Sequence, residues 1–350
     1  HIGALPYVLS QVNVPVYASR LTHGLITVKL REAQVHGARV QEVAPGETVH
    51  LGNFEVEFFR VCHSIPDAMG LAIRTPAGNL VHTGDFKFDH TPVDGKRTDF
   101  GKLAELGMEG VLLLLSDSTY AELPGYTPSE QVVGETLNRV IREAPGRVIV
   151  ATFASLISRV QQVVDAAVKD DRRVFVFGRS MVGNVQIATK LGYLEIPPGT
   201  LAQSDELATI PNGKTVIVTT GTQGEPTSAL VRMANQNHRE VTIVPGDTVV
   251  MSATPIPGNQ TLVHKTIDNL YRQGARVLYG KLDQVHVHGH ASQEELKAMI
   301  SLTKPRYFVP IHGEYRHLQL HAGIAESLGI PKKNIFVLED GDVLELTAST

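Results

Sequence analysis

The sequence contains no tryptophan and only one cysteine, Cys62, among its 350 residues. A single thiol cannot form an intramolecular disulfide, so a disulfide-stapled secreted fold is excluded and a reducing, cytoplasmic environment is expected. No nucleophilic triad is recognisable around Cys62. We therefore expect it to be a small buried residue.

Long apolar runs are also absent. The strongest run, at residues 111–115, is far shorter than the roughly 18 residues that a membrane span requires. It is typical of a buried strand, and no signal-peptide pattern precedes it. We therefore expect no membrane partner.

Neither sign of charge is in large excess, because 32 basic and 36 acidic residues leave a net charge of −4. This balance indicates no polyanionic partner, although a local basic groove would still allow one. With 42% hydrophobic residues the chain can bury a real core, and its length favours about two domains. It begins at His1 without a methionine, so we expect it to be a piece of a longer protein.

Residues 14–117 are predicted to be mostly strands. FEVEFFRVC (54–62) alternates in hydrophobicity, residues 70–86 suggest a hairpin, and VLLLLSD (111–117) is a buried strand that ends at Asp117.

After Asp117, strands and helices alternate. A Thr127-Pro-Ser-Glu130 capping box predicts a helix to about Glu143. Further strands are predicted at 147–153, 172–178, 215–221 and 241–245, with helices beginning near 155, 181, 227 and 261. This order indicates a parallel α/β unit. From 276 on, we expect a strand, a helix over 292–302, a strand near 306–311 and a final helix with strands.

The stretch VHVHGHASQEE (285–295) places His286, His288 and His290 at every second position. In an extended segment these three imidazoles share one face. Buried histidines need partners for both ring nitrogens, so three together are poor core residues. Metal and phosphate are the candidate ligands.

Three further positions place chemistry at predicted strand ends, and a fourth lies at the start of the chain. They are His312 in PIHGEYRHL (310–318), Asp85 in HTGDFKFD (82–89), His63 in CHSIPD (62–67), and His1 at the start of the chain. Imidazoles and carboxylates at several strand ends suit a binuclear hydrolytic metal site with a shared carboxylate. Patterns for P-loop, dinucleotide and HExxH sites are missing from the sequence.

Taken in order, these motifs, together with Asp117-Ser-Thr and Gly221-Thr-Gln-Gly-Glu-Pro, resemble the β-CASP branch of the metallo-β-lactamase superfamily, and within it the bacterial ribonucleases. The resemblance implies an α/β fold, in which a metallo-β-lactamase αββα sandwich is split by an inserted β-CASP domain. The expected boundaries are 1–119 and 279–350 for the first domain and 120–278 for the insert.

The resemblance also implies a metal site for two divalent ions, zinc or manganese. His1 matches the last residue of the family's His-x-His-x-Asp-His motif, whose other ligands would lie upstream. His63 and His312 match further ligands, Asp85 matches the bridging and catalytic carboxylate, and Asp117 matches the acid that orients neighbouring ligands. With the upstream ligands missing, this stretch alone is expected to bind metal poorly.

Other residues match positions that handle the RNA. His290 matches the histidine that protonates the leaving oxygen, and His286 would touch the same phosphate. His288 departs from the serine expected there, and its role stays open. The strand-to-helix turn at residues 151–161 resembles the segment that contacts RNA in this family. The phosphate-binding candidates there and at other helix starts and turns are Ser155, Arg159, Arg179, Ser180 and the loop at residues 221–225.

The implied activity is metal-dependent hydrolysis of RNA, as a 5′-to-3′ exonuclease and an endonuclease in RNA processing and decay. The implied partners are single-stranded RNA with a 5′ monophosphate, further copies of the chain and members of an RNA-degradation complex. Two alternatives are an inactive β-CASP RNA-binding or assembly subunit, which would carry substituted ligands, and a small-ester metallohydrolase, which would lack the insert.

Overall fold

The computed structural model describes residues 2–256, 258–280 and 283–347. The chain forms two compact units. Unit 1 comprises His1–Pro128 and Gly289–Thr350, and unit 2 comprises Ser129–His288. Both boundaries lie later in the chain than the expected ones at 119/120 and 278/279.

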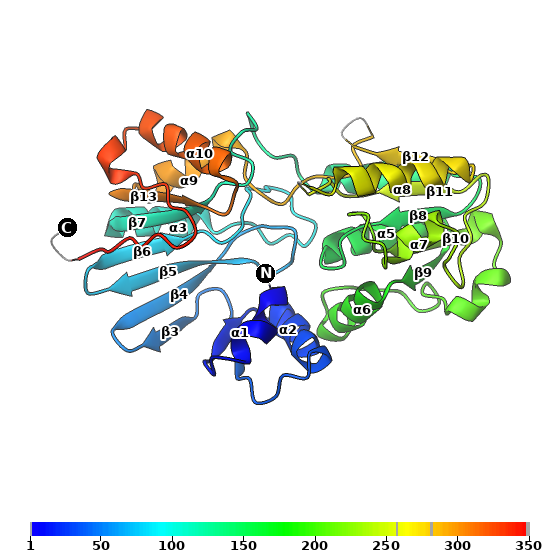
Figure 1. The fold of residues 1–350 in the computed structure, drawn as a ribbon, viewed down its shortest axis with the longest axis horizontal. Coiled ribbons are helices and arrows are strands. Elements are labelled where there is room, and N and C mark those ends of the chain that lie inside the picture. Colours follow the sequence, from blue (N-terminus) through cyan, green and yellow to red (C-terminus); the bar gives the residue numbers. More distant parts are fainter. Residues whose placement is uncertain (1, 257, 281–282, 348–350) are drawn as a thin grey trace. The chain divides into compact units, whose positions relative to one another are not determined.

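Unit 1 is built on a six-stranded mixed sheet in the order β13-β7-β6-β5-β4-β3 (Figure 1). Its strands are β3 (Thr48–Leu51), β4 (Phe54–Arg60), β5 (Met69–Thr75), β6 (Gly78–His82), β7 (Val111–Asp117) and β13 (Tyr307–Ile311). The first four pair antiparallel, while β7 pairs parallel with both β6 and β13. The carboxyl ends of β6, β7 and β13 therefore meet at one edge, although β13 comes from the far end of the chain.

Helix α9 (Gln293–Thr303) packs on β7 and between two further helices, α3 (Phe100–Glu109) and α10 (Tyr315–Ser327), and α10 also packs on β13. Their apolar faces close a core that includes Phe59, Leu114, Leu296 and Phe308. Burying each such side chain contributes about 1.5–3 kcal/mol, so this core holds the strand ends in place.

The N-terminal part of unit 1 has a small core of its own around Ala18, Ile26 and Leu30. It consists of η1 (Ile2–Ala4), α1 (Leu5–Leu9), β1 (Val16–Ala18), α2 (Arg20–Glu32) and β2 (Val40–Glu42). Strands β1 and β2 pair parallel as a separate sheet.

Unit 2 is a parallel five-stranded sheet in the order β12-β11-β8-β10-β9. Its strands are β8 (Val148–Ala151), β9 (Arg173–Phe177), β10 (Thr215–Thr219), β11 (Thr248–Met251) and β12 (Arg276–Tyr279). Its helices are α4 (Gln131–Glu143), α5 (Ile157–Lys169), α6 (Arg179–Leu191), α7 (Ala229–Ala234) and α8 (Gln260–Arg272), with η2 (Ser204–Ala208) and η3 (Asn212–Lys214) between them. Every residue of β8, β10 and β11 is buried, as in a sheet covered on both faces.

The predicted strands at 54–62 and 111–117, the hairpin at 70–86 and the parallel unit are confirmed. Cys62 is buried, as predicted. No helix in the part of the chain that the structure describes is long and apolar enough to cross a bilayer.

Several expectations are wrong. Residues 20–32 form a helix, α2, which the sequence did not predict because its isoleucine, threonine and valine favour strands. Helix α3 was not predicted either. Residues 241–245 are not a strand, since β11 begins only after the turn at Gly246. Among the described residues, no strand follows α10; only η4 (Lys332–Asn334) and a single bridge do.

The capping box at Thr127 is also wrong. Helix α4 begins at Gln131, and the Glu130 side chain makes no cap. Its carboxylate instead forms an ion pair with Arg159 inside unit 2.

Arg159 was expected to contact RNA phosphate, and its burial contradicts this. Its side chain is 0% exposed. The guanidinium donates to Glu130, to the Ser252 hydroxyl and, at 3.0 Å, to the carbonyl of Val285. Its donors are thus used inside unit 2, where they fix the backbone just before His286.

The buried ion pair predicts a large loss of stability when one partner is removed. Arg159→Met leaves the Glu130 carboxylate buried without its cation, which costs about 3–5 kcal/mol. The double variant Glu130→Gln/Arg159→Met should recover part of that loss. Urea unfolding measures both.

Arg142→Met is the matched control, because this side chain on α4 is 66% exposed and should change the stability little. Equal stability of the Arg142 and Arg159 variants would contradict the buried network.

Candidate functional site

The loop that follows β6 carries Asp85 to the edge where β7 and β13 also end. Gly84 precedes it with a φ of +62°, and a Cβ there would come within 2.6 Å of the Met69 carbonyl oxygen. Only glycine fits this turn without strain. The Thr83 hydroxyl then accepts the N–H of Asp117 at 3.1 Å, which fastens the loop to the end of β7.

Asp117, the last residue of β7, lies between two imidazoles. Its Oδ2 is 2.7 Å from Nδ1 of His290, and its Oδ1 is 3.3 Å from Nδ1 of His312. Burial would raise the pKa of this carboxyl, but the hydrogen bonds from His290 and His312 outweigh it and hold the pKa well below its usual range. Asp117 is therefore ionised at neutral pH.

His312 follows β13 with an unusual backbone. Its φ is +55°, a left-handed conformation that non-glycine residues rarely adopt. The Thr119 hydroxyl lies 2.8 Å from Nδ1 and 2.9 Å from the carbonyl oxygen of His312, and 2.7 Å from Asp117. The hydrogen bond between the His312 ring and Asp117 is the main cause that raises the pKa of His312. Thr119 thus holds a strained residue at the site.

His63 enters the site from the segment after β4. Its Nδ1 is 2.8 Å from the carbonyl oxygen of Gly289, and its Nε2 is 3.9 Å from Asp85. A Cβ on Gly289 would come within 2.8 Å of the His63 ring, so glycine permits this approach. Burial, and then the neighbouring His290, lower the pKa of His63 to about 4. The ring is neutral at pH 7.

These contacts fix the histidine tautomers. A carbonyl or a carboxylate oxygen can only accept, so Nδ1 carries the proton in His63, His290 and His312. In each ring, Nε2 is then the nitrogen that can bind a cation or handle a second proton. Such a backbone or carboxylate partner on Nδ1 is the usual support of a metal-binding histidine.

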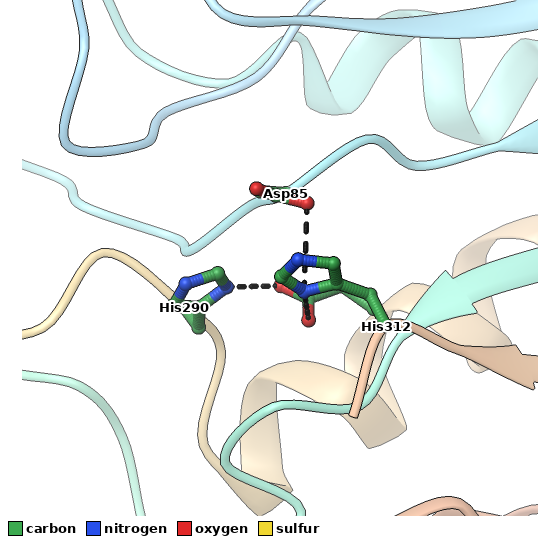
Figure 2. A group of neighbouring side chains, drawn as sticks. Asp85, His290 and His312 are labelled. Carbon is green, nitrogen blue, oxygen red and sulfur yellow. Dashed lines mark hydrogen bonds and ion pairs between the residues drawn. The ribbon is translucent and has the colours of Figure 1, made fainter. Parts of the chain in front are cut away.

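Asp85, Asp117, His290 and His312 form a cluster that could hold a metal ion, because each offers a ligand atom within 4.8 Å of the others. Figure 2 shows the two imidazoles beside Asp85, which lies 3.7 Å from Nδ1 of His312. Imidazole with carboxylate is a donor set suited to zinc or manganese. The residues fit a divalent metal.

The remaining predicted site histidines are His1, expected to bind metal, and His286 and His288, expected near the phosphate. His1 lies outside the described residues. His286 and His288 belong to unit 2, whereas His290 belongs to unit 1. The period-two pattern appears as an alternation of burial, since Val285 and Val287 are buried and the three histidines are half-buried, but the segment is not a strand.

Three of the phosphate candidates are exposed near strand ends of unit 2. Ser155 lies in the turn between β8 and α5, and Arg179 and Ser180 open α6 after β9. Strand β10 separates β8 from β9 in the sheet, and the loop at 221–225 follows it. This edge of a parallel sheet is a usual ligand site. Arg159 is excluded by its burial.

His321 lies beneath the site and was missed by the sequence analysis. This α10 residue is fully buried, with Nδ1 2.9 Å from the Ser118 hydroxyl, next to Asp117. Its Nε2 has no hydrogen-bond partner among the described residues. Burial lowers the pKa of His321 to about 3.

The chain was compared with known proteins. Residues 145–270 match the family model "Ribonuclease J, beta-CASP domain", and residues 276–337 match "Zn-dependent metallo-hydrolase RNA specificity domain". Ribonuclease J 1 of Streptococcus pyogenes is 48% identical over 100% of this chain and 62% of that protein. Ribonuclease J of Synechocystis is 49% identical over 99% of this chain and 55% of that protein.

The chain belongs to the ribonuclease J family. Ribonuclease J2 of Bacillus subtilis is 43% identical over 99% of this chain and 62% of that protein, so the chain spans roughly half to three fifths of these relatives. A solved structure of a protein of unknown function from Enterococcus faecalis has the same fold, with a TM-score of 0.67 at 17% identity over 94% of this chain and 75% of that chain. The metallo-β-lactamase fold with a β-CASP domain is thereby confirmed.

The pKa of His321 predicts an acid-sensitive stability. Its folded pKa of about 3 lies below the ordinary 6.5, so its contribution is full above pH 6.5 and is lost as the pH falls toward 3. Between pH 7.5 and 5 the loss should be about 2 kcal/mol. His321→Asn keeps a donor to Ser118 without titrating. Urea unfolding at both pH values should show the variant less sensitive to acid by that amount, and parallel pH profiles would contradict the assignment.

Proposed function

We propose that the protein is a metal-dependent ribonuclease that hydrolyses RNA phosphodiesters. The observation that carries this proposal is the convergence of Asp85, Asp117, His290 and His312 within 4.8 Å, from the ends of β6, β7 and β13 and from the loop before α9. The family match supports RNA as the substrate, and the β-CASP match over residues 145–270 argues against a small ester.

His63, Asp85 and His312 would hold divalent cations, with Asp85 between the histidines. Its oxygens lie 3.9 Å from Nε2 of His63 and 3.7 Å from the ring of His312, which supports a position of Asp85 beside both histidines. When bound, the cations supply Lewis-acid stabilisation of the charge on the phosphoryl oxygens. Two ions, of zinc or manganese, are part of the proposal. His1 would add a further ligand.

His290 would donate a proton from Nε2 to the departing oxygen of the RNA. Asp117 accepts from Nδ1 at 2.7 Å, which orients the ring and stabilises the positive charge that it carries before transfer. Asp117 also orients His312 through its other oxygen and through Thr119. One ionised carboxylate thus positions both the proton donor and a metal ligand.

The RNA would be bound by residues of unit 2. His286, His288, Ser155, Arg179 and Ser180 are the proposed phosphate contacts, since the last three lie exposed at helix starts or turns where backbone N–H groups favour anions. We further propose that the substrate is a 5′-monophosphorylated single strand and that the enzyme cuts RNA both as an exonuclease and as an endonuclease. The protein would be a cytoplasmic homo-oligomer with partners in RNA degradation.

The test is cleavage of 5′-monophosphorylated RNA by the full-length protein. Activity should disappear on chelation and return with manganese or zinc. His290→Ala should lower kcat about 100- to 10,000-fold, the usual contribution of a general acid, while RNA binding measured by fluorescence anisotropy persists.

His50→Ala is the control, because this histidine of unit 1 is exposed on β3, outside the site. A wild-type protein without metal-dependent cleavage would refute the proposal. Loss of RNA binding and turnover to the same extent in His290→Ala would refute the donor role.

A further inference from the structure

The Glu295 carboxylate is fully buried and accepts hydrogen bonds from three segments of unit 1. Its Oε1 accepts the N–H of Phe88 at 2.6 Å. Its Oε2 accepts the N–H of Thr127 at 2.7 Å and of Ser292 at 2.8 Å. These donors lie up to two hundred residues apart in the sequence, so a single side chain joins three distant pieces of backbone.

Each segment leads directly to the site. Phe88 belongs to the loop that carries Asp85, and Ser292 follows His290. Thr127 reaches the same histidine by a second route, because its hydroxyl donates to the His290 carbonyl oxygen at 2.8 Å. Glu295 is therefore linked through backbone to both Asp85 and His290.

Helix capping explains only part of this arrangement. Ser292 and Glu295 form a capping box at the start of α9. Of the three N–H groups that the Glu295 carboxylate accepts, the capping box accounts only for that of Ser292. The bonds to Phe88 and Thr127 come from segments outside that helix. Each buried N–H would lack a partner if the carboxylate were removed, at a cost of about 1–3 kcal/mol.

A second contact ties the same loop to the same segment. Lys87 and Asp89 form a buried ion pair at 3.3 Å, and Lys87 also donates to the carbonyl oxygen of Pro128 at 3.3 Å. The Asp85 loop is thus bound to Pro128 through Lys87 and to α9 through Glu295. Displacement of Glu295 would shift this loop against His290.

We propose that Glu295 is a positioning residue that sets Asp85 at its working distance from His290. This inference rests on the proposed ribonuclease function. Glu295 touches no substrate, and it acts through the backbone of Phe88, Thr127 and Ser292. Misplacement of a catalytic group by small distances lowers turnover more than binding.

Glu295→Gln tests the role with little change in volume. An amide has one acceptor oxygen, and its NH2 group would face a backbone N–H. If the oxygen keeps the place of Oε2, the bonds to Thr127 and Ser292 survive and the one to Phe88 is lost. The Asp85 loop would then be the segment released.

The experiment measures kcat, KM and manganese content of full-length wild type and variants at saturating manganese, with thermal unfolding alongside. Glu295→Gln should lower kcat about 10- to 100-fold, as loss of a supporting hydrogen bond does at other metal sites, with KM for RNA nearly unchanged. Asp247→Asn is the matched control, since this buried carboxylate of unit 2 accepts the N–H of Val244 and pairs with Arg147, and it belongs to no proposed site. It should lower the unfolding temperature but not kcat.

Glu295→Asp decides the matter if Glu295→Gln does not fold, because it keeps the buried carboxylate but shortens the side chain, which draws the acceptors away from the N–H groups of Phe88 and Thr127 and should lower kcat in the same way. A kcat for the folded Glu295 variant equal to that of Asp247→Asn would overturn the inference while the ribonuclease function stands. Wild type without metal-dependent cleavage would overturn both.

Discussion

The structure of the site depends on one buried carboxylate. Asp117 is 1% exposed and lies between the imidazoles of His290 and His312, and it stays ionised because both rings donate to it. A buried charge is tolerated only when its hydrogen bonds are made. The fold meets that demand with two histidines and Thr119, and the tautomers that result leave Nε2 of each ring for chemistry.

The sheet brings these groups together. Strands β6, β7 and β13 run parallel, so Asp85, Asp117 and His312 follow three neighbouring carboxyl ends, although nearly two hundred residues separate β7 from β13. Loops at such an edge need rigid support. Glycine at 84 and 289 permits the close approaches, while Glu295 and Lys87 tie the loops to α9 and to one another. The positions of the site residues therefore depend on local contacts made by residues that are not proposed metal ligands.

Sequence could predict the strands that carry the site, because a run such as residues 111–117 is apolar throughout and ends in a carboxylate. It also indicated that His63, Asp85 and His312 stand at strand ends. It could not reveal that Arg159 is buried against Glu130, since an arginine at a helix start reads equally as a phosphate ligand. Glu295 was visible as the end of a Ser-x-x-Glu pattern, but its bonds to Phe88 and Thr127 depend on tertiary contacts. The boundary that separates His288 from His290 has the same origin.

We propose that Asp117 orients the residues that would hold the metal and does not bind the metal itself. Anomalous scattering from manganese in crystals of the full-length protein tests this directly. We expect a peak within coordination distance of Asp85 and Nε2 of His312, and weaker, displaced density in Asp117→Asn. A strong peak bonded to Asp117, or a peak unchanged in the variant, would refute this orienting role.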